Sequence, residues 1–404
     1  MSRLKLAIIA THPVQYTVPV LRVMAQYGWL ELKVFYTWSQ TQNGYFIDRE
    51  FGTQVSWDIP LLNGYEHEFV ANTASDPGPH HFNGICTPKL CKVITTWGAD
   101  AVLIIGWNNQ AHLKAMRYFK GRIPVFFRGD STLLDDQPRW RVYLRRLALR
   151  RVYKYVDVAI SVGRASRDYF YFCGLPHSRI AFAPHCVDNH RFADGQPASD
   201  HQARLWRQQF GIADDQIVIG FAGKLIEKKD PALLINAFID SGVSAYLVIC
   251  GSGNLESSLR SLAAQRNDIH FLPFQNQSLM PAVYRLFDVF VLPSRGPGET
   301  WGLAINEAMA CGRAVIASTK AGATTDLVNS EFNGWQFPAQ DRQSLSNVLT
   351  AAVAMGKQGL QQLGNNGLQT IQQWSTEVSA KKIADTVLSY SSLLADDQDV
   401  ALNV

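Results

Sequence analysis

Short apolar runs alternate with longer amphipathic stretches along the whole chain. In the first half the runs are LKLAIIA (4–10), ELKVFYT (31–37), AVLIIG (101–106), IPVFF (123–127), DVAISV (157–162) and RIAFAP (179–184). In the second half they are IVIGFAG (217–223), AYLVIC (245–250), IHFLPF (269–274), DVFVLP (288–293) and AVIAS (314–318). Apolar runs between helical stretches are typical of strands buried on both faces of a parallel sheet. The pattern predicts an α/β fold in both halves.

A largely polar segment that also contains Gly195 and Pro197, residues 188–200, separates the two halves. A chain of 404 residues is also long for a single hydrophobic core. We therefore predict two doubly wound, Rossmann-like domains over residues 1–195 and 196–385, then a C-terminal helix or tail over 386–404 that could pack back on the first domain. In such folds ligands bind beyond the carboxyl ends of the strands, here in the cleft between the domains.

Composition narrows the class of protein. The chain is 47% apolar and 18% charged, which favours a large buried core. A net charge of +4 suits anionic ligands, but no nucleic-acid-binding module is recognisable. The six cysteines show no C-x-x-C pair or zinc spacing, which is typical of reduced thiols in a cytosolic protein. The short apolar run before His12 predicts a first strand rather than a signal peptide, and no apolar run reaches eighteen residues.

The segment GETWGLAINEAMACG (298–312) carries the most specific chemistry. Glu299 and Glu307 flank Gly302, and a strand precedes them. A helix beginning near Gly302 would offer free backbone N–H groups to a phosphate and place both carboxylates near sugar hydroxyls. The alternative is a surface helix with two solvated acids, which the flanking strand–Pro–Ser and Ala-Met-Ala-Cys-Gly pattern disfavours. The N–H groups expected to face the phosphate are those of Trp301, Gly302 and Leu303.

This segment, extended to PSRGPGETWGLAINEAMACGRAVIAS (293–318), resembles the E-x7-E signature of family 4 of the retaining glycosyltransferases, the group 1 glycosyl transferases with the GT-B fold. The resemblance implies that Glu299 approaches the donor sugar and Glu307 holds the ribose. It implies a retaining hexosyltransferase that uses a UDP- or GDP-sugar and a glycan or lipid-linked acceptor, in cell-surface polysaccharide or glycolipid synthesis.

A second stretch, GFAGKLIEKKDPALLINAF (220–238), follows a strand and opens a helix. Asp230 is a suitable N-cap with Pro231 at the first helical position. Lys224 and Lys229 lie between the strand and the helix, where they could neutralise a departing diphosphate. Judged on these residues alone, a solvated basic turn is the favoured interpretation.

The resemblance changes that balance, because the family has G-R-L-x3-K-G at this place. Gly223, Lys224 and Lys229 match it, while Lys224 replaces the usual Arg and Asp230 the usual Gly. Lysine keeps the charge but loses the two-pronged geometry of a guanidinium. Phe274 lies where relatives place the base-binding loop, although core packing is the alternative.

The resemblance also implies that the N-terminal domain binds the acceptor. Candidate residues on the loops after its strands are His12, Asn108, Arg128 and Asp130. Relatives often have a histidine near the position of Arg128, so that role does not transfer directly. His12 could reach the cleft or only bond within its loop, and Asp130 could orient an acceptor hydroxyl or cap a turn.

Residues 139–155 are rich in Arg and contain no acidic residue. This basic, amphipathic stretch could dock on anionic lipid, attract a charged glycan, or pair with acids elsewhere. We therefore expect a cytoplasmic protein, or one peripheral on the inner face of the membrane. The D-x-D formed by Asp397 and Asp399 falls in a predicted frayed tail, so we expect no metal and no cofactor besides the donor substrate.

Two other functions remain open at this point. A nucleotide-sugar epimerase would share the two-domain fold but convert the donor without an acceptor. A non-catalytic subunit of a polysaccharide assembly complex would bind the donor without turnover. The paired glutamates and lysines argue against the second alternative.

Overall fold

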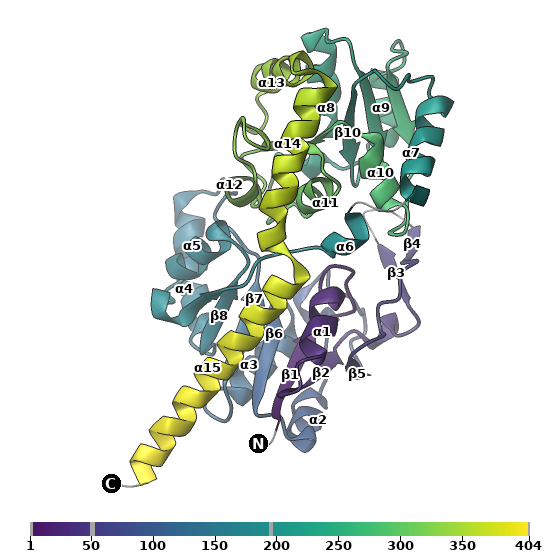
Figure 1. Ribbon diagram of the computed structural model, residues 1–404. Coiled ribbons are helices and arrows are strands. Elements are labelled where there is room, and N and C mark those ends of the chain that lie inside the picture. Colours follow the sequence, from purple (N-terminus) through teal and green to yellow (C-terminus); the bar gives the residue numbers. More distant parts are fainter. Residues whose placement is uncertain (1–2, 49–52, 194–196, 403–404) are drawn as a thin grey trace.

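A computed structural model of the chain describes residues 3–48, 53–193 and 197–402, without the side chains of 45–55 and 393–402. Two α/β domains lie one above the other (Figure 1). Each contains a parallel sheet with helices on both faces. This arrangement confirms the predicted pair of doubly wound, Rossmann-like domains.

The N-terminal sheet has seven parallel strands in the order β5-β2-β1-β6-β7-β8-β9. Side chains of β1 alternate between two clusters, with Leu6 and Ile8 in one and Ala7 and Ile9 in the other, so the strand is buried on both faces. The strands are β1 (Leu4–Ala10), β2 (Leu30–Tyr36), β5 (Glu66–Phe69), β6 (Ala101–Ile105), β7 (Val125–Gly129), β8 (Val158–Ser161) and β9 (Ile180–Phe182). The helices are α1 (Val18–Ala25), α2 (Leu90–Trp97), α3 (Gln110–Phe119), α4 (Arg139–Tyr153) and α5 (Arg164–Phe172), with short 3-10 turns η1 (Ser39–Thr41), η2 (Phe82–Gly84) and η3 (His177–Arg179).

A small antiparallel hairpin, β3 (Tyr45–Asp48) with β4 (Thr53–Ser56), lies beside this sheet and reaches toward the other domain (Figure 1). The segment after β4 is hydrogen-bonded to the C-terminal domain, because the Asp58 carboxylate accepts from the backbone N–H of Ser278 at 3.0 Å.

The C-terminal sheet has six parallel strands in the order β12-β11-β10-β13-β14-β15. They are β10 (Val218–Ala222), β11 (Tyr246–Cys250), β12 (Ile269–Leu272), β13 (Val289–Leu292), β14 (Ala314–Ser318) and β15 (Gly334–Phe337). The helices of this domain are α7 (Pro197–Gln209), α8 (Pro231–Ser241), α9 (Glu256–Leu262), α10 (Met280–Leu286), α11 (Ala304–Ala310), α12 (Thr324–Leu327), α13 (Arg342–Ala354) and α14 (Gly356–Ile371), with the turn η4 (Glu227–Lys229).

The chain crosses between the domains twice. The first crossing follows β9 through α6 (Asn189–Phe192), and the second leaves α14 through η5 (Gln372–Trp374) into α15 (Thr376–Leu402). The two crossings are bonded together, because the Asn189 amide donates to the Ile371 carbonyl at 3.0 Å and the Ser379 hydroxyl to the Pro184 carbonyl at 2.9 Å.

Helix α15 runs back along the N-terminal domain beside α1 (Figure 1). Ala380, Ile383 and Val387 are buried in the cluster that contains Leu21 and Met24 of α1. The C-terminal helix therefore begins at Thr376, ahead of the tail expected over 386–404, and its apolar stripe holds it on the first domain. The side chains of Asp397 and Asp399 lie outside the described residues.

No helix among the described residues is both long and apolar enough to cross a membrane.

Candidate active site

A cavity of about 980 Å³ lies between the domains, beyond the carboxyl ends of both sets of strands. Its C-terminal wall contains the segments after β10 and β13, and its N-terminal wall the loop after β1. Residues predicted from the sequence that line it are His12, Gly223, Lys224, Lys229, Phe274, Leu303 and Glu307.

Lys229 lines the cavity and forms a buried ion pair with Glu299, which is not itself among the lining residues. The ammonium nitrogen of Lys229 lies 2.6 Å from Oε2 of Glu299, and the same oxygen accepts from the Ser294 hydroxyl at 2.9 Å. Glu299 is only 7% exposed. Burial alone would raise its pKa, but the charge and hydrogen bond of Lys229, aided by Lys228 and Ser294, outweigh burial and lower the pKa. The carboxylate is therefore held ionised.

The loop after β10, which carries the lysines, depends on two residues with special backbone requirements. A Cβ on Gly251 would lie 1.9 Å from the Gly223 carbonyl oxygen, so only glycine lets the loops after β10 and β11 approach this closely. Asp230 has φ of +48°, the left-handed region, and its side chain caps α8 by accepting from the N–H of Leu233 at 3.3 Å. The predicted cap is confirmed, and aspartate at a position usually occupied by glycine is explained, because aspartate tolerates this conformation.

Glu307 lies on α11 one turn after Leu303, and both line the cavity as predicted. Its Oε2 accepts from the Tyr284 hydroxyl at 2.6 Å. Burial raises the pKa of Glu307, although the Tyr284 bond, Arg191 and Lys229 oppose that shift. Tyr284 thus fixes one oxygen of the carboxylate and leaves the other available to a ligand.

Helix α11 begins at Ala304, slightly later than predicted. Gly302 has φ of +99°, and a Cβ there would lie 2.8 Å from a methyl carbon of Leu292, so glycine is needed for the turn. Leu303 and Ala304, at the amino end of the helix, line the cavity. The helix end therefore faces the space expected to hold a phosphate.

Of the three residues whose backbone N–H groups were expected to face the phosphate, Leu303 lines the cavity, while Trp301 and Gly302 do not. The Trp301 side chain is used elsewhere. Its ring is 2% exposed, and its Nε1 donates to the Asn306 side chain at 2.9 Å. It packs against His185 and Trp374, whose ring centroids are 5.9 and 5.2 Å away. The indole therefore belongs to the interdomain core beside the second chain crossing.

On the N-terminal side, His12 lines the cavity next to Trp38 with ring centroids 5.4 Å apart. Its Nδ1 lies 2.9 Å from the Thr11 hydroxyl oxygen. Burial lowers the pKa of His12 to about 4, so the ring is neutral near pH 7. A neutral imidazole has one nitrogen that donates a hydrogen bond and one that accepts.

Arg128 lies at the end of β7 and is committed to the fold. Its guanidinium donates to the carbonyls of Ala183 and Pro184 at 2.9 and 3.0 Å. Burial lowers its pKa to about 10. These bonds connect β7 to the first chain crossing. Arg128 therefore stabilises the fold next to the site and does not line the cavity.

Asp130 joins the two domains. Its Oδ2 accepts from the Thr300 hydroxyl at 2.6 Å, one residue after Glu299. The neighbouring Asp135 carboxylate accepts from the Gly298 N–H at 3.1 Å. This loop therefore holds the segment that carries Glu299. Asn108 is exposed and outside the cavity, while its neighbour Asn109 caps α3.

The sequence did not single out several residues of the site. Lys228 lines the cavity and its ammonium lies 3.4 Å from the Gly298 carbonyl oxygen. Its place beside Lys229 in the same turn could have indicated it. Tyr284 and Trp38 come from apolar stretches that resemble core segments, so no local signal distinguishes them.

Residues 202–370 match the family described as "Glycosyl transferases group 1". The matched range includes Lys229, Glu299 and Glu307.

Among characterised relatives, the chain is 28% identical over 260 residues to a GDP-mannose-dependent monoacylated alpha-(1-6)-phosphatidylinositol monomannoside mannosyltransferase of Corynebacterium glutamicum, covering 60% of this chain and 65% of that protein. It is 30% identical over 233 residues to a D-inositol 3-phosphate glycosyltransferase of Saccharomonospora viridis, covering 54% of this chain and 51% of that protein. The chain spans from about a third to just under two thirds of the length of these and the other first relatives.

Solved structures share the fold over nearly the whole chain. Anabaena HepE in complex with UDP has a TM-score of 0.71 at 18% identity and covers 96% of this chain and 100% of its own. WaaG, a glycosyltransferase involved in lipopolysaccharide biosynthesis, has a TM-score of 0.64 at 14% identity, with 95% and 99% covered. The predicted GT-B fold is confirmed.

Proposed function

We propose that the chain is a retaining glycosyltransferase that moves a sugar from a UDP- or GDP-sugar to a glycan or lipid-linked acceptor. The observation that carries the proposal is the Glu299–Lys229 pair at 2.6 Å, in which Lys229 lines the same interdomain cleft as Glu307 and Glu299 lies directly behind it. An ionised carboxylate suits the sugar hydroxyls, a lysine suits the diphosphate, and Glu307 suits the ribose. The Corynebacterium glutamicum relative is named as GDP-mannose-dependent, and HepE was solved in complex with UDP. UDP-sugars and GDP-sugars are therefore both reasonable donors.

In the proposed reaction the acceptor hydroxyl attacks the anomeric carbon on the face from which the diphosphate leaves. The bond from the anomeric carbon to the phosphate oxygen breaks with its electron pair on that oxygen. The donor phosphate then takes the acceptor's proton. Lys224, Lys229 and the amino end of α11 stabilise the charge that develops on the leaving group.

We propose that neutralisation of the diphosphate needs no metal. Lys224, Lys228 and Lys229 all line the cavity from the segment between β10 and α8, so the protein itself supplies cations to a diphosphate. Transfer activity should therefore survive treatment with EDTA.

The donor is tested by a thermal-shift panel of UDP-, GDP- and ADP-sugars, because a ligand that binds the native state raises its melting temperature. The stabilising donor is then incubated with and without candidate acceptors. Formation of a glycosylated product with retained anomeric configuration supports the proposal. Conversion of the donor sugar without any acceptor would establish an epimerase instead, and donor binding without turnover a non-catalytic subunit.

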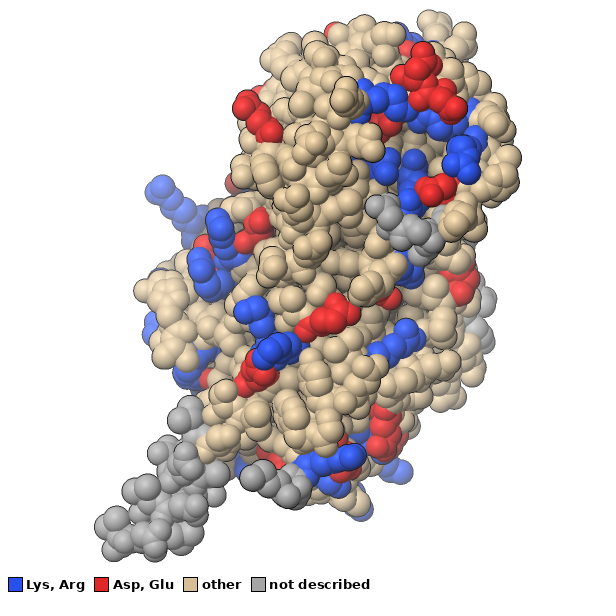
Figure 2. All heavy atoms as spheres, viewed as in Figure 1, with Lys and Arg blue, Asp and Glu red and all other residues tan. Residues whose placement is uncertain are grey.

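We propose further that α4 places the enzyme at the inner face of the membrane. Trp140, Tyr143 and Leu144 are 60%, 60% and 55% exposed on this helix, among its arginines. Arg145 and Arg146 lie over the rings of Tyr169 and Phe172 rather than beside acids. In Figure 2, blue basic side chains project from the flank where α4 and α5 lie. Exposed aromatic and basic side chains together favour an anionic lipid surface.

Flotation with vesicles of anionic or neutral lipid, at low and high salt, tests this placement. Binding to anionic vesicles should fall when Trp140, Tyr143 and Leu144 are replaced by serine. Replacement of Phe332, which is 43% exposed on the C-terminal domain, is the matched control. If the wild-type chain floats with neither anionic nor neutral vesicles, the membrane placement is overturned, whereas the proposed transferase activity is not.

A further inference from the structure

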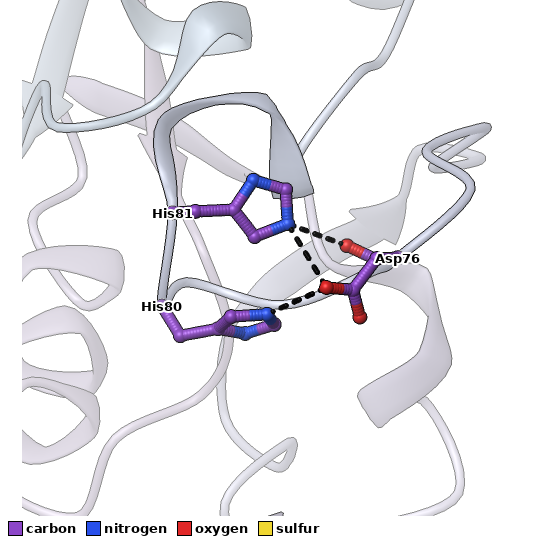
Figure 3. A group of neighbouring side chains, drawn as sticks. All are labelled: Asp76, His80 and His81. Carbon is purple, nitrogen blue, oxygen red and sulfur yellow. Dashed lines mark hydrogen bonds and ion pairs between the residues drawn. The ribbon is translucent and has the colours of Figure 1, made fainter.

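Three polar side chains converge on the loop between β5 and α2. The Nε2 atoms of His80 and His81 lie 3.0 and 3.4 Å from the same oxygen, Oδ2 of Asp76 (Figure 3). The three candidate ligand atoms all lie within 4.8 Å of one another. Nε2 of His81 also lies 3.0 Å from the Asp76 backbone carbonyl oxygen (Figure 3). Two neighbouring histidines thus turn their rings toward the oxygens of one residue instead of pointing to opposite sides.

The loop backbone is shaped around the two rings. Gly78 donates its N–H to the Gly84 carbonyl at 3.0 Å, which closes the loop. A Cβ on Gly78 would lie 2.5 Å from Nδ1 of His80, whereas one on Gly84 would clash first with the Gly78 carbonyl oxygen and would lie 3.0 Å from Nε2 of His81. A larger residue at Gly78 would therefore displace the His80 ring, and one at Gly84 would disturb the backbone closure of the loop. Both glycines allow the loop to close around the two rings.

We propose that Asp76, His80 and His81 form a binding site for a divalent transition metal, and that this metal is Zn²⁺. Tetrahedral zinc with bonds of about 2.0–2.1 Å keeps neighbouring ligand atoms about 3.3 Å apart. The two distances from the carboxylate oxygen bracket that spacing. Imidazole nitrogens favour zinc over Mg²⁺ and Ca²⁺, which prefer oxygen ligands.

Three protein ligands leave a tetrahedral ion one position for water or for an oxygen of another molecule. His80 also lines the interdomain cavity, together with Pro77 and Pro79 of the same loop. The metal would therefore fix the cavity wall opposite the lysines and place an open coordination position near its rim. This role is separate from neutralisation of the diphosphate, so the site does not depend on the proposed reaction.

Isothermal titration of the full-length, EDTA-treated chain with ZnCl₂ tests the site. We expect one Zn²⁺ per chain that is lost or weakened by roughly tenfold or more in a His80→Ala/His81→Ala double variant, because loss of even an outer-sphere partner costs about that much. Hydrogen exchange should show Zn²⁺-dependent protection of the amides of residues 76–84 in the wild-type chain alone.

The matched control is His190→Ala, which removes another exposed histidine that lies near a carboxylate, that of Glu377 at 3.9 Å. It should bind zinc like the wild type. Because the loop is exposed, circular dichroism and thermal melting should show all variants folded. Absence of binding in the wild type, or binding that the double variant keeps through the cysteines, would overturn the proposal.

Discussion

The Lys229 ammonium lies 2.6 Å from the Glu299 carboxylate, so the two residues predicted to act on opposite parts of the donor are paired with each other. Each has a charge that would be costly to bury alone. The pair keeps Glu299 ionised and Lys229 oriented before a ligand arrives. A donor diphosphate would then compete with Glu299 for the lysine and leave the carboxylate facing the sugar.

Replacement of Glu299 by alanine should lower the turnover number by at least about a hundredfold, since a preorganised charged group at the reacting centre is removed. The melting temperature should show that the domain stays folded. Turnover is measured with the donor and acceptor pair found in the screen. Near-normal turnover would show that Glu299 does not act on the donor sugar.

Replacement of Lys229 by methionine should lower the free energy of unfolding at pH 7 by about 3 kcal/mol, because Glu299 is left buried without its cation. A Lys229→Met/Glu299→Gln double variant should recover most of that loss. Urea denaturation measures both. Lys228→Met, which removes a neighbouring lysine outside the pair, should cost less than Lys229→Met, and equal costs would argue against a special role for the pair.

The same pair has a defined pH dependence. The folded-state pKa of Glu299 is lowered, so the pair contributes stability above the ordinary carboxyl pKa and loses it as the pH falls through the folded value. The deficit of Lys229→Met relative to the wild type should accordingly shrink on acidification. A deficit independent of pH would point to lost packing rather than lost charge.

Replacement of Glu307 by glutamine should weaken nucleoside diphosphate binding by roughly tenfold, the usual cost of a charged hydrogen bond. Tyr284→Phe should cause a smaller loss, since it frees the carboxylate that Tyr284 orients at 2.6 Å but leaves its charge. Calorimetric titration with UDP and GDP distinguishes the two. A larger effect of Tyr284→Phe would mean that the tyrosine itself contacts the ligand.

A buried histidine should make the fold sensitive to mild acid. His112 is fully buried, with Nδ1 2.7 Å from the Gly106 carbonyl and Nε2 3.0 Å from the Thr37 hydroxyl, and burial lowers its pKa to about 4. The unfolded chain takes up this proton near pH 6.5, so stability is complete above that pH and falls toward pH 4. The expected slope is about 1.4 kcal/mol per pH unit for this one site.

Denaturation curves between pH 7 and 4 measure how the free energy of unfolding changes with pH. In His112→Gln this slope should be smaller by the contribution of one proton, about 1.4 kcal/mol per pH unit. His12 and His185, whose pKa values burial also lowers to about 4, add to the wild-type slope in the same direction. Equal slopes in the wild type and His112→Gln would contradict the assignment.

The pattern of apolar residues along the chain was sufficient to predict most strands of the two parallel sheets. Strand β1 occupies Leu4–Ala10 and β14 Ala314–Ser318, as the apolar runs predicted. Strand β5 was not predicted because its sequence, EHEF, is polar, and two of its acids pair with Lys33 of the neighbouring strand. Strand β15 was missed because Gly334 and Gln336 interrupt the apolar pattern.

The donor side of the site was likewise accessible, since Glu299, Lys229 and Glu307 fall in motifs whose spacing is local. The acceptor side was not. The sequence could not show that the Arg128 guanidinium is used by the Ala183 and Pro184 carbonyls, because those partners lie far along the chain. Nor could it show that the Trp301 ring lies beside Trp374 rather than a ligand.

The bonded pair of chain crossings has a mechanical consequence. Segments near Pro184–Asn189 and Ile371–Ser379 are joined side by side, so they act as a double-stranded pivot rather than two separate tethers. We expect such a paired connection to resist twisting of one domain against the other more than a single connection would. Removal of α15 would also take Ala380, Ile383 and Val387 out of the core of the N-terminal domain, so the second crossing contributes to the stability of that domain as well as to the alignment of the two halves of the site.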